Sequence, residues 1–375
     1  MIYLDNAATT RVCPEAAEAA LKTMTEDFGN PSSTHGPGRR ARDLLKSARE
    51  TVAASLGARP EEIFFTAGGT EGDNWAIRSG ARKMRHRGRH IISSAGEHDA
   101  VLKTLAYMEA QGWEVTRLAP GPEGAVSPEA VLAALREDTV LVSLMLVNNE
   151  TGAVTDIPAV SRGLKAAGSK ALLHTDAVQG FMKVPFTARS LGADMITLSG
   201  HKIHAPKGVG ALYVRAGLNL PPLLLGGGQE SGKRSGTENL PGIRAFQAAI
   251  TVAQRDRDAR SRMAALRQRA ADTLTAAVPE LVIVGGGAPH ILNLSLPGYK
   301  SEVLLNYLDA VGVCVSKGSA CKKGARSHVL EAMGLPNPVI DGSIRVSLCR
   351  FTTEEDIDGF CRALLEARSR LLTVL

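Results

Sequence analysis

Two apolar runs that lead into chemically active residues constrain the fold of this chain more than any other feature. Residues 171–173 lead into Asp176, and residues 195–198 end shortly before Lys202. Both runs have the length and composition of buried strands. In open α/β sheets, ligands bind in the crevice beyond the carboxyl ends of the strands. The sequence therefore predicts an α/β fold that delivers an acid and a lysine to one crevice.

An acid and a lysine in one crevice are the pair that pyridoxal 5'-phosphate (PLP) requires. The lysine holds the aldehyde of the cofactor as a Schiff base, and the acid keeps the pyridine nitrogen protonated so that the ring can withdraw electrons. A lysine after a strand is more often a solvated surface residue. The acid and the lysine therefore indicate a PLP site only in combination with the other motifs of the chain.

A glycine-rich turn follows the strand that we expect at 62–66, and a helix through Trp75 and Ile77 follows the turn. Backbone N–H groups and the helix dipole at such a junction bind phosphate, and the hydroxyl of Thr70, next to Gly69, adds a donor. Most glycine-rich turns are only tight turns. This one indicates a phosphate site because it accompanies the acid and the lysine.

Polar side chains also follow or interrupt other predicted strands. His98 follows the strand at 90–94, where a histidine is either an ordinary buried polar residue or a ring that stacks on the pyridine. Asn149 follows the buried strand at 139–147 and could donate to a phenolic oxygen or a substrate carboxylate. Arg345 is the one charged residue of an apolar strand; its guanidinium suits a carboxylate, and a structural ion pair is the alternative.

Cys321 lies in a loop rich in glycine and serine, flanked by Lys317, Lys322, Lys323 and Arg326. Nearby cations stabilise a thiolate, and exposure makes it reactive. An incidental loop cysteine is the alternative, but cysteine is usually buried. The five cysteines are scattered and odd in number, so they do not indicate a disulfide framework. We interpret Cys321 as a nucleophile.

Length and composition suit a globular protein with two domains. The chain has 375 residues, of which 44% are hydrophobic. A continuous helical pattern from 242 to 277 links the two parts. We expect a large domain at 15–255, and a smaller α+β domain built from 1–14 and 256–375 that carries the cysteine loop.

The charge pattern argues against several classes of partner. The net charge of +6 is mild for a nucleic-acid binder, and no aromatic residues are interleaved with the basic run at 82–89. We expect that run to be a solvated helix end, with an acidic partner surface as the less favoured use. No apolar run reaches the length of a membrane span, and the first residues do not resemble a signal peptide. We therefore expect a cytoplasmic protein without membrane or direct nucleic-acid contacts, and without a metal site.

Taken together, these motifs resemble the cysteine desulfurases of the NifS/IscS type, within the class V aminotransferase family of PLP enzymes. The resemblance covers essentially the whole chain and is specific because its motifs keep their order and spacing. Besides those described above, the motifs are Tyr-Leu-Asp-Asn-Ala-Ala-Thr-Thr at 3–10, Phe-Gly-Asn-Pro-Ser-Ser at 28–33, Asn-Asn-Glu at 148–150, Arg-Ser-Gly-Thr at 234–237 and Arg-Phe-Thr-Thr-Glu-Glu at 350–355.

The resemblance implies an aspartate-aminotransferase-like fold, with a mainly parallel seven-stranded sheet flanked by helices in the large domain. It implies that Lys202 binds PLP covalently and that Asp176 pairs with the pyridine nitrogen. Gln179 would contact the phenolic oxygen, where Asn149 is also expected. His98 would stack on the ring and take part in catalysis.

The resemblance also assigns the phosphate and the substrate. Thr237 would reach the phosphate from the second subunit of a homodimer. Asn149 and Arg345 would hold the carboxylate of the substrate, and Cys321 would be the catalytic nucleophile. The phosphate would be bound within one chain by Gly69, Thr70, Ser199 and His201.

The activity implied by the resemblance is removal of sulfur from L-cysteine, which gives L-alanine and a persulfide on Cys321. The sulfur would pass to a protein acceptor: an iron–sulfur scaffold, a tRNA-thiolation enzyme or a relay protein. Selenocysteine lyase, or another class V aminotransferase or lyase activity, is the alternative. An ordinary aminotransferase needs no such thiol, which favours the desulfurase.

The sequence departs from the family pattern in places. Asp73 stands where family members often have asparagine, and Asp99 where proline is frequent. The segment after Cys321 is slightly shorter than in the housekeeping enzymes, and it has Lys322 and Lys323 where threonine and serine are common. These departures leave the chemistry intact, but a shorter loop reaches less far, which bears on the acceptor.

Overall fold

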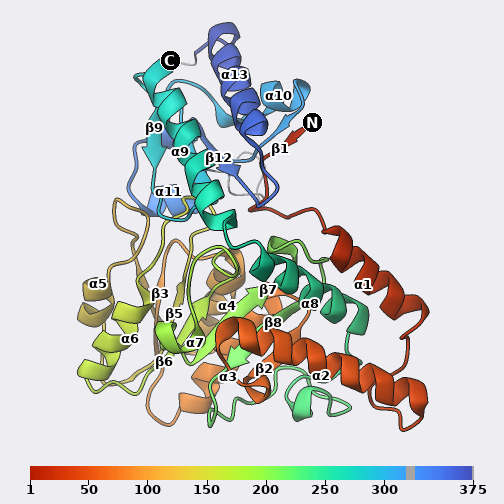
Figure 1. Cartoon of the computed structure of the whole chain (residues 1–375). Helices are drawn as coiled ribbons and strands as arrows, with labels where there is room; N and C mark the ends of the chain where they lie inside the picture. Colours follow the sequence, from red (N-terminus) through yellow and green to blue (C-terminus); the bar gives the residue numbers. More distant parts are fainter. Residues whose placement is uncertain (318–325, 374–375) are drawn as a thin grey trace.

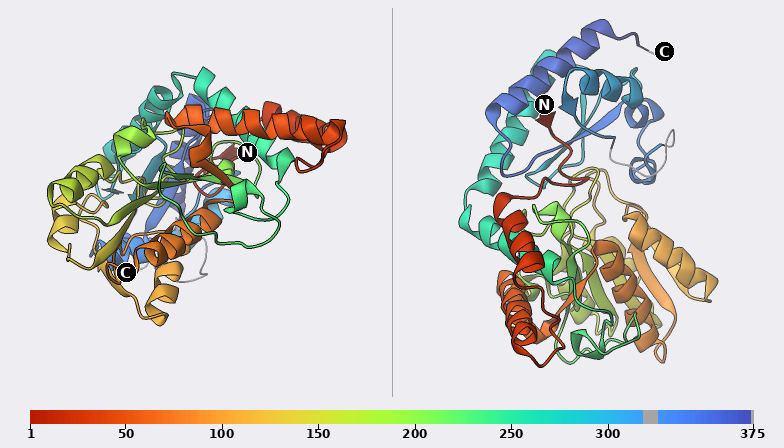
Figure 2. Two further views of the ribbon diagram at one scale, coloured as in Figure 1. Left: turned by 90° about the horizontal axis from the view of Figure 1, so that it is seen from below. Right: turned by 90° about the vertical axis from the view of Figure 1, so that its right-hand side faces the viewer.

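The computed structural model describes residues 1–317 and 326–373 of the chain. Figure 1 shows a larger body built around a sheet and a smaller body above it, which holds both ends of the chain. Figure 2 shows from the side how the first residues run from the smaller body down to α1 (Pro14–Thr25) beside the larger one.

The larger body contains a seven-stranded sheet, as predicted. Its order is β2-β8-β7-β6-β5-β3-β4, and only β8 runs antiparallel to its neighbours. Every residue of the central strands β5 to β8 is buried, because helices cover both faces. In sequence order the strands are β2 (Ile63–Thr66), β3 (His90–Ser94), β4 (Glu114–Leu118), β5 (Thr139–Met145), β6 (Leu172–Asp176), β7 (Met195–Ser199) and β8 (Gly210–Val214).

Alternation along the strands divides the core into two layers. Leu172 and Met195 pack with α3 (Gly69–Met84) and α4 (Asp99–Ala110) on one face of the sheet. Leu173 and Ile196 point to the opposite face, because successive side chains of a strand alternate. The helices on that face are α2 (Gly36–Leu56), α5 (Pro128–Ala133), α6 (Ile157–Ala166), α7 (Ala188–Leu191) and α8 (Leu240–Arg255).

The smaller body combines short sheets with three long helices. Its apolar cluster includes Leu4 from the start of the chain together with side chains from α9, α10 and α13. The helices are α9 (Ala259–Ala277), α10 (Ser301–Ala310), α11 (His328–Ala332), α12 (Asn337–Asp341) and α13 (Glu354–Arg370). The strands are β9 (Val282–Val284), β10 (Ile291–Ser295) and β12 (Ser343–Ser347), which are antiparallel, and the parallel pair β1 (Ile2–Tyr3) and β11 (Val313–Cys314).

The expected continuous helix from 242 to 277 is wrong. Two helices, α8 and α9, occupy this stretch, separated by residues 256–258. Asp256 has a non-helical backbone, and its carboxylate accepts from Arg262 at 2.7 and 2.9 Å. Aspartate competes with helical hydrogen bonding and favours helix ends. The domain boundary at 255 and 256 stays a prediction.

Within the described residues, no helix combines the length and the apolar composition that crossing a membrane requires.

Candidate active site

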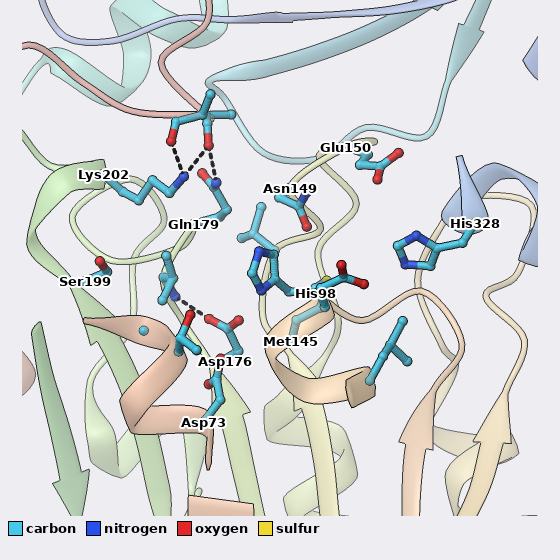
Figure 3. A pocket seen from close by; sticks show the side chains of 18 of the residues that line it. Asp73, His98, Met145, Asn149, Glu150, Asp176, Gln179, Ser199, Lys202 and His328 are labelled. Carbon is cyan, nitrogen blue, oxygen red and sulfur yellow. Dashed lines mark hydrogen bonds between the residues drawn. The ribbon is translucent and has the colours of Figure 1, made fainter. Parts of the chain in front are cut away.

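A cavity of about 900 Å³ lies beyond the carboxyl ends of β5, β6 and β7, with the smaller body on its far side. Met145, Asp176 and Ser199, the last residues of these three strands, all line it. Figure 3 shows their side chains pointing into this space. Most of the predicted site residues line the same cavity: Gly69, Thr70, His98, Asn149, Asp176, Gln179, Ser199, His201, Lys202 and Arg345.

Lys202 ends a short 3-10 turn at Gly200–Lys202, directly after β7. Its Nζ donates hydrogen bonds to the carbonyl oxygens of Ala7 and Ala8, both at 2.6 Å (Figure 3). Burial lowers the pKa of Lys202 to about 8, and the positive charge of Arg345 contributes in the same direction. The uncharged amine that reacts with an aldehyde is therefore far more abundant near neutral pH than in an ordinary lysine, although the protonated form still predominates.

Asp176 is the last residue of β6, and its Oδ1 accepts from the backbone N–H of Val178 at 2.8 Å. Burial raises the pKa of Asp176, whereas the positive charges of His98 and Lys202 act to lower it. His98 caps α4, where its Nδ1 accepts from the backbone N–H of Ala100 at 3.1 Å. The structure therefore brings the acid, the lysine and the candidate stacking ring together.

Gln179 follows Asp176 on the same wall of the cavity. Its Nε2 donates to the carbonyl oxygen of Ala7 at 2.8 Å, and its Oε1 accepts from Lys183 Nζ at 3.5 Å. Lys183 is buried, and desolvation together with the charge of Lys202 lowers its pKa to about 7. Lys183 could not be predicted as a site residue, because it lies in a turn without apolar periodicity.

The start of α3 forms a glycine cradle at one side of the cavity. Gly68 has φ 149°, which favours glycine. A Cβ on Gly69 would lie 2.8 Å from Val178 Cγ2, and one on Gly210 would lie 2.9 Å from Gly68 Cα. Larger residues would therefore displace the backbone whose N–H groups are available to an anion.

Hydroxyls and a neutral imidazole complete the anion site next to this cradle. Thr70 and Ser199 line the cavity, and His201 Nδ1 lies 3.3 Å from Thr9 Oγ1. Burial lowers the pKa of His201 to about 4, followed by the charge of Lys202. The glycine cradle, the buried carboxyl of Asp176 and the partly uncharged Lys202 fit the phosphate, the ring nitrogen and the aldehyde of PLP.

Arg345 comes from β12 of the smaller body and is only 2% exposed. Its Nη1 donates to the carbonyl oxygen of Asn149 at 2.7 Å. Its Nη2 donates to Asp5 Oδ1 and to Ser316 Oγ, both at 2.8 Å. Arg345 therefore forms the structural ion pair that was the alternative interpretation, and it also lines the cavity.

Cys321 and its neighbours Lys322 and Lys323 lie outside the described residues. The described cations on either side form ion pairs: Lys317 with Glu302 at 3.2 Å, and Arg326 with Asp341 at 2.7 Å. Their charges are therefore partly compensated, which the sequence did not indicate.

The chain that follows the cysteine loop is tied to the larger body. Ser327 Oγ donates to Glu150 Oε2 at 2.5 Å, and His328 Nε2 lies 3.0 Å from the carbonyl oxygen of Glu97. Both contacts border the cavity, which His328 and Glu150 line.

Thr237 does not line the main cavity of its own chain. It lies at a second cavity of about 130 Å³. The loop that carries it is anchored by Glu230, whose carboxylate accepts from Arg49 at 2.6 and 2.7 Å, and by an ion pair of 2.7 Å between Arg234 and Glu71. Within one chain, the structure therefore does not bring Thr237 to the other predicted phosphate ligands.

Comparisons with known proteins agree with this geometry. The family model described as class V aminotransferase matches residues 2–360. A cysteine desulfurase of Trichormus azollae is 45% identical over 99% of this chain and 94% of its own length, and a cysteine desulfurase IscS of Methanosarcina thermophila is 42% identical over 99% and 92%.

Solved structures show the same relationship. A NifS-like protein superposes with a TM-score of 0.93, is 38% identical, and covers 99% of this chain and 100% of its own. A NifS-like protein from Rickettsia africae ESF-5 has a TM-score of 0.88 and 31% identity, with 98% and 99% covered. The chain thus belongs to the class V aminotransferase family of PLP-dependent enzymes and, as predicted, to its cysteine desulfurases of the NifS/IscS type.

Proposed function

We propose that this chain removes the sulfur of L-cysteine with PLP bound at Lys202, releases L-alanine, and keeps the sulfur as a persulfide on Cys321. One observation supports this proposal most strongly. Asp176 and Lys202, from neighbouring strands, share a cavity with Arg345, which comes from the other body. PLP needs an acid such as Asp176 at its ring nitrogen and a lysine such as Lys202 at its aldehyde. The carboxylate of an amino acid substrate needs a cation such as Arg345.

PLP, when bound, joins the amino group of the substrate through its aldehyde carbon and withdraws electrons from Cα. Asp176 would hold the proton on the ring nitrogen, since a carboxylate at hydrogen-bonding distance favours the protonated form. His98 would pack on the ring, and Gln179 would donate to the phenolic oxygen. The phosphate would bind at Gly69 and Thr70, with Ser199 and His201 nearby.

Lys202 would move the proton of Cα. Its Nζ donates to the carbonyl oxygens of Ala7 and Ala8 at the wall of the cavity. Its pKa of about 8 is close to neutral pH. A general base works best when its pKa is near the operating pH. Arg345 and Asn149 would hold the substrate carboxylate so that the Cα–H bond faces this amine.

Cys321 would carry out the sulfur step. Its thiolate attacks the sulfur of the bound cysteine, so that an S–S bond forms while the C–S bond breaks. The electron pair of the broken bond passes to the carbon skeleton, which takes up a proton and leaves as alanine. The persulfide is then delivered to a protein acceptor: an iron–sulfur scaffold, a tRNA-thiolation enzyme or a relay protein. A cytoplasmic location stays a prediction.

A homodimer would complete the site. Apolar side chains are exposed on α1 and in the loop after it, at Leu21, Met24 and Phe28, the last 72% exposed. Leu225, in the loop that leads to Thr237, is 86% exposed. Such apolar side chains suit an interface. A second copy would cover them and bring Thr237 to the phosphate of its partner.

The variant Cys321→Ser tests the central assignment. PLP binding and the spectral change on addition of cysteine depend on Lys202, Asp176 and Arg345, which are intact in this variant. Formation of alanine should be almost abolished, because a serine hydroxyl is a poor nucleophile towards sulfur. Alanine at the wild-type rate, with no other cysteine carrying a persulfide, would contradict the proposal. Assays of sulfide and selenide release separate this activity from selenocysteine lyase.

A further inference from the structure

Two buried carboxyl groups lie side by side in the floor of the cavity. Asp73, in the second turn of α3, is 1% exposed and lines the cavity together with Asp176 from β6. Figure 3 shows Asp73 directly below Asp176. Only Asp176 has a role in the proposed reaction.

The two carboxyl groups are unequally equipped to carry a negative charge. Asp176 accepts from the backbone N–H of Val178 at 2.8 Å, and His98 and Lys202 favour its ionised form. Asp73 Oδ1 is buried and has no hydrogen-bond partner among the described residues. Among the described residues, the contact that stabilises a charge on this carboxyl group is a hydrogen bond with the side chain of Thr197. A buried carboxylate needs several donors, so Asp176 is the better anion.

His174 does not supply the missing positive charge. Its Nε2 lies 3.7 Å from Asp73 Oδ1, but its ring is fully buried, and burial lowers its pKa to about 3. The ring is therefore neutral. It bridges two hydroxyls, with Nδ1 at 2.8 Å from Ser143 Oγ and Nε2 at 2.9 Å from Thr197 Oγ1.

The other groups around Asp73 oppose a negative charge on it. Burial raises the pKa of Asp73 well above its usual range, and the negative charges of Asp176 and then Glu97 act in the same direction. Glu97 is 1% exposed and accepts from the backbone N–H of Met145 at 2.9 Å. The strands β2, β5 and β7, which pack against α3, carry no charged side chain.

We propose that Asp73 is a neutral carboxylic acid that keeps the proton of this pair, so that Asp176 alone carries the negative charge offered to the ring nitrogen of PLP. The proposal rests on the proposed function, which places that nitrogen at Asp176. The negative charge of Asp176 acts directly on Asp73, and two neighbouring carboxyl groups in a buried site do not both ionise. Asp73 is thus a positioning residue: it sets the charge beneath the ring without contacting the reacting atoms.

The hydroxyls and the imidazole form a consistent network around this proton. The Asp73 carboxylic acid donates to Thr197 Oγ1, Thr197 donates to His174 Nε2, and His174 Nδ1–H donates to Ser143 Oγ. Each of these three donors then has an acceptor, and the imidazole stays neutral. An ionised Asp73 would require the opposite direction of every bond and would leave an anion with one donor.

Infrared difference spectra of the PLP-loaded enzyme test this assignment. The spectrum of the wild type minus Asp73→Asn should contain the carbonyl stretch of a protonated carboxylic acid, displaced when D2O replaces H2O. Asparagine has the same shape, so PLP absorbance should show an intact site. A difference spectrum that contains only carboxylate bands would overturn the proposal. Burial also raises the pKa of Glu97 well above its usual range, so the spectrum of Glu97→Gln in H2O minus that in D2O is the control: it removes Glu97, should keep the acid band of Asp73, and serves if Asp73→Asn does not fold.

Two further measurements separate the charge from a merely structural effect. The midpoint of the pH titration of the bound cofactor's absorbance should be almost unchanged in Asp73→Asn, whereas loss of an ionised neighbour would shift it by about 1–3 pH units. In Asp176→Asn, the acid band of Asp73 should titrate away at lower pH, because its negative neighbour is gone. If the acid band of Asp73 had the same pH midpoint in Asp176→Asn as in the wild type, the proposed coupling of Asp73 to Asp176 would be overturned. Failure of PLP to bind the wild type would contradict the proposed function instead, and the infrared test can then be made without the cofactor.

Discussion

Arg345 Nη2 lies 2.8 Å from Asp5 Oδ1, which joins a strand of the smaller body to the first residues of the chain. Further bonds to the carbonyl oxygen of Asn149 and to Ser316 Oγ fix the plane of the guanidinium at the cavity wall. The site for the substrate carboxylate is therefore prepared before the substrate arrives, which lowers the cost of ordering on binding.

The substitution Arg345→Lys should raise KM for cysteine by about 10–100-fold, because a lysine loses the planar, bidentate geometry of the guanidinium. PLP absorbance should stay intact, since Arg345 is not among the groups proposed to hold the cofactor. Steady-state kinetics on the loaded enzyme measure the effect. Asp5→Asn, which keeps the size of the side chain and leaves Arg345 in place, is the matched control and should change KM less. An unchanged KM in Arg345→Lys would contradict the carboxylate site.

The rate at which PLP joins Lys202 of the cofactor-free protein should rise with pH and be half-maximal near pH 8, because only the uncharged amine reacts and its pKa is about 8. Arg345→Met removes a positive charge that lowers this pKa, so the midpoint should move upward. Stopped-flow absorbance measures both values. Lys202→Ala should form no bond to PLP that borohydride can reduce. A midpoint near the ordinary lysine value of 10.5 would show that the amine is not perturbed.

Asp176→Asn should still bind PLP but should form alanine at least about 10²-fold more slowly, the usual cost of losing one electrostatic stabiliser. A neutral amide cannot hold the proton on the ring nitrogen as a carboxylate does. Alanine production is measured together with cofactor absorbance, so that loss of binding is not mistaken for loss of reactivity. Near-wild-type alanine production would remove Asp176 from its proposed role.

Residues at strand ends could be placed from the sequence alone. Asp176 and Lys202 follow recognisable buried strands, and parallel strands bring their carboxyl ends to one edge, so the shared cavity was predictable. Thr237 was assigned through the family resemblance, and a single chain does not bring it to the cavity. The break at Asp256 was missed although the sequence marks it: residues 254–258 are all polar and interrupt the apolar pattern.

Buried charged residues were the hardest to predict. Asp73 and Lys183 are each less than a tenth exposed. In a sequence, charged residues normally indicate the solvated face of an element. For Asp73 one signal was present: at helical spacing it shares a face of α3 with Ala76, Ile77 and Gly80, which are small or apolar and buried. Lys183 offers no such signal, because only the tertiary fold covers it.

Lys183→Met should stabilise the protein, and the gain should be largest below about pH 7. Lys183 is buried, its hydrogen bond to Gln179 Oε1 is long at 3.5 Å, and its pKa falls from 10.5 to about 7, chiefly through desolvation. Between these two values the unfolded chain binds more protons than the folded one, so wild-type stability rises with pH across this range. Below about pH 7 both states are protonated, and the folded state bears the full cost of the buried charge, on the order of 5 kcal/mol at 1.36 kcal/mol per pKa unit. The advantage of methionine should therefore shrink as pH rises from 7 and should vanish near 10.5.

Thermal unfolding at several pH values measures this difference in stability for the wild type, Lys183→Met and the charge-retaining control Lys183→Arg. A pH-independent difference between wild type and Lys183→Met would show that packing, and not the buried charge, governs this position.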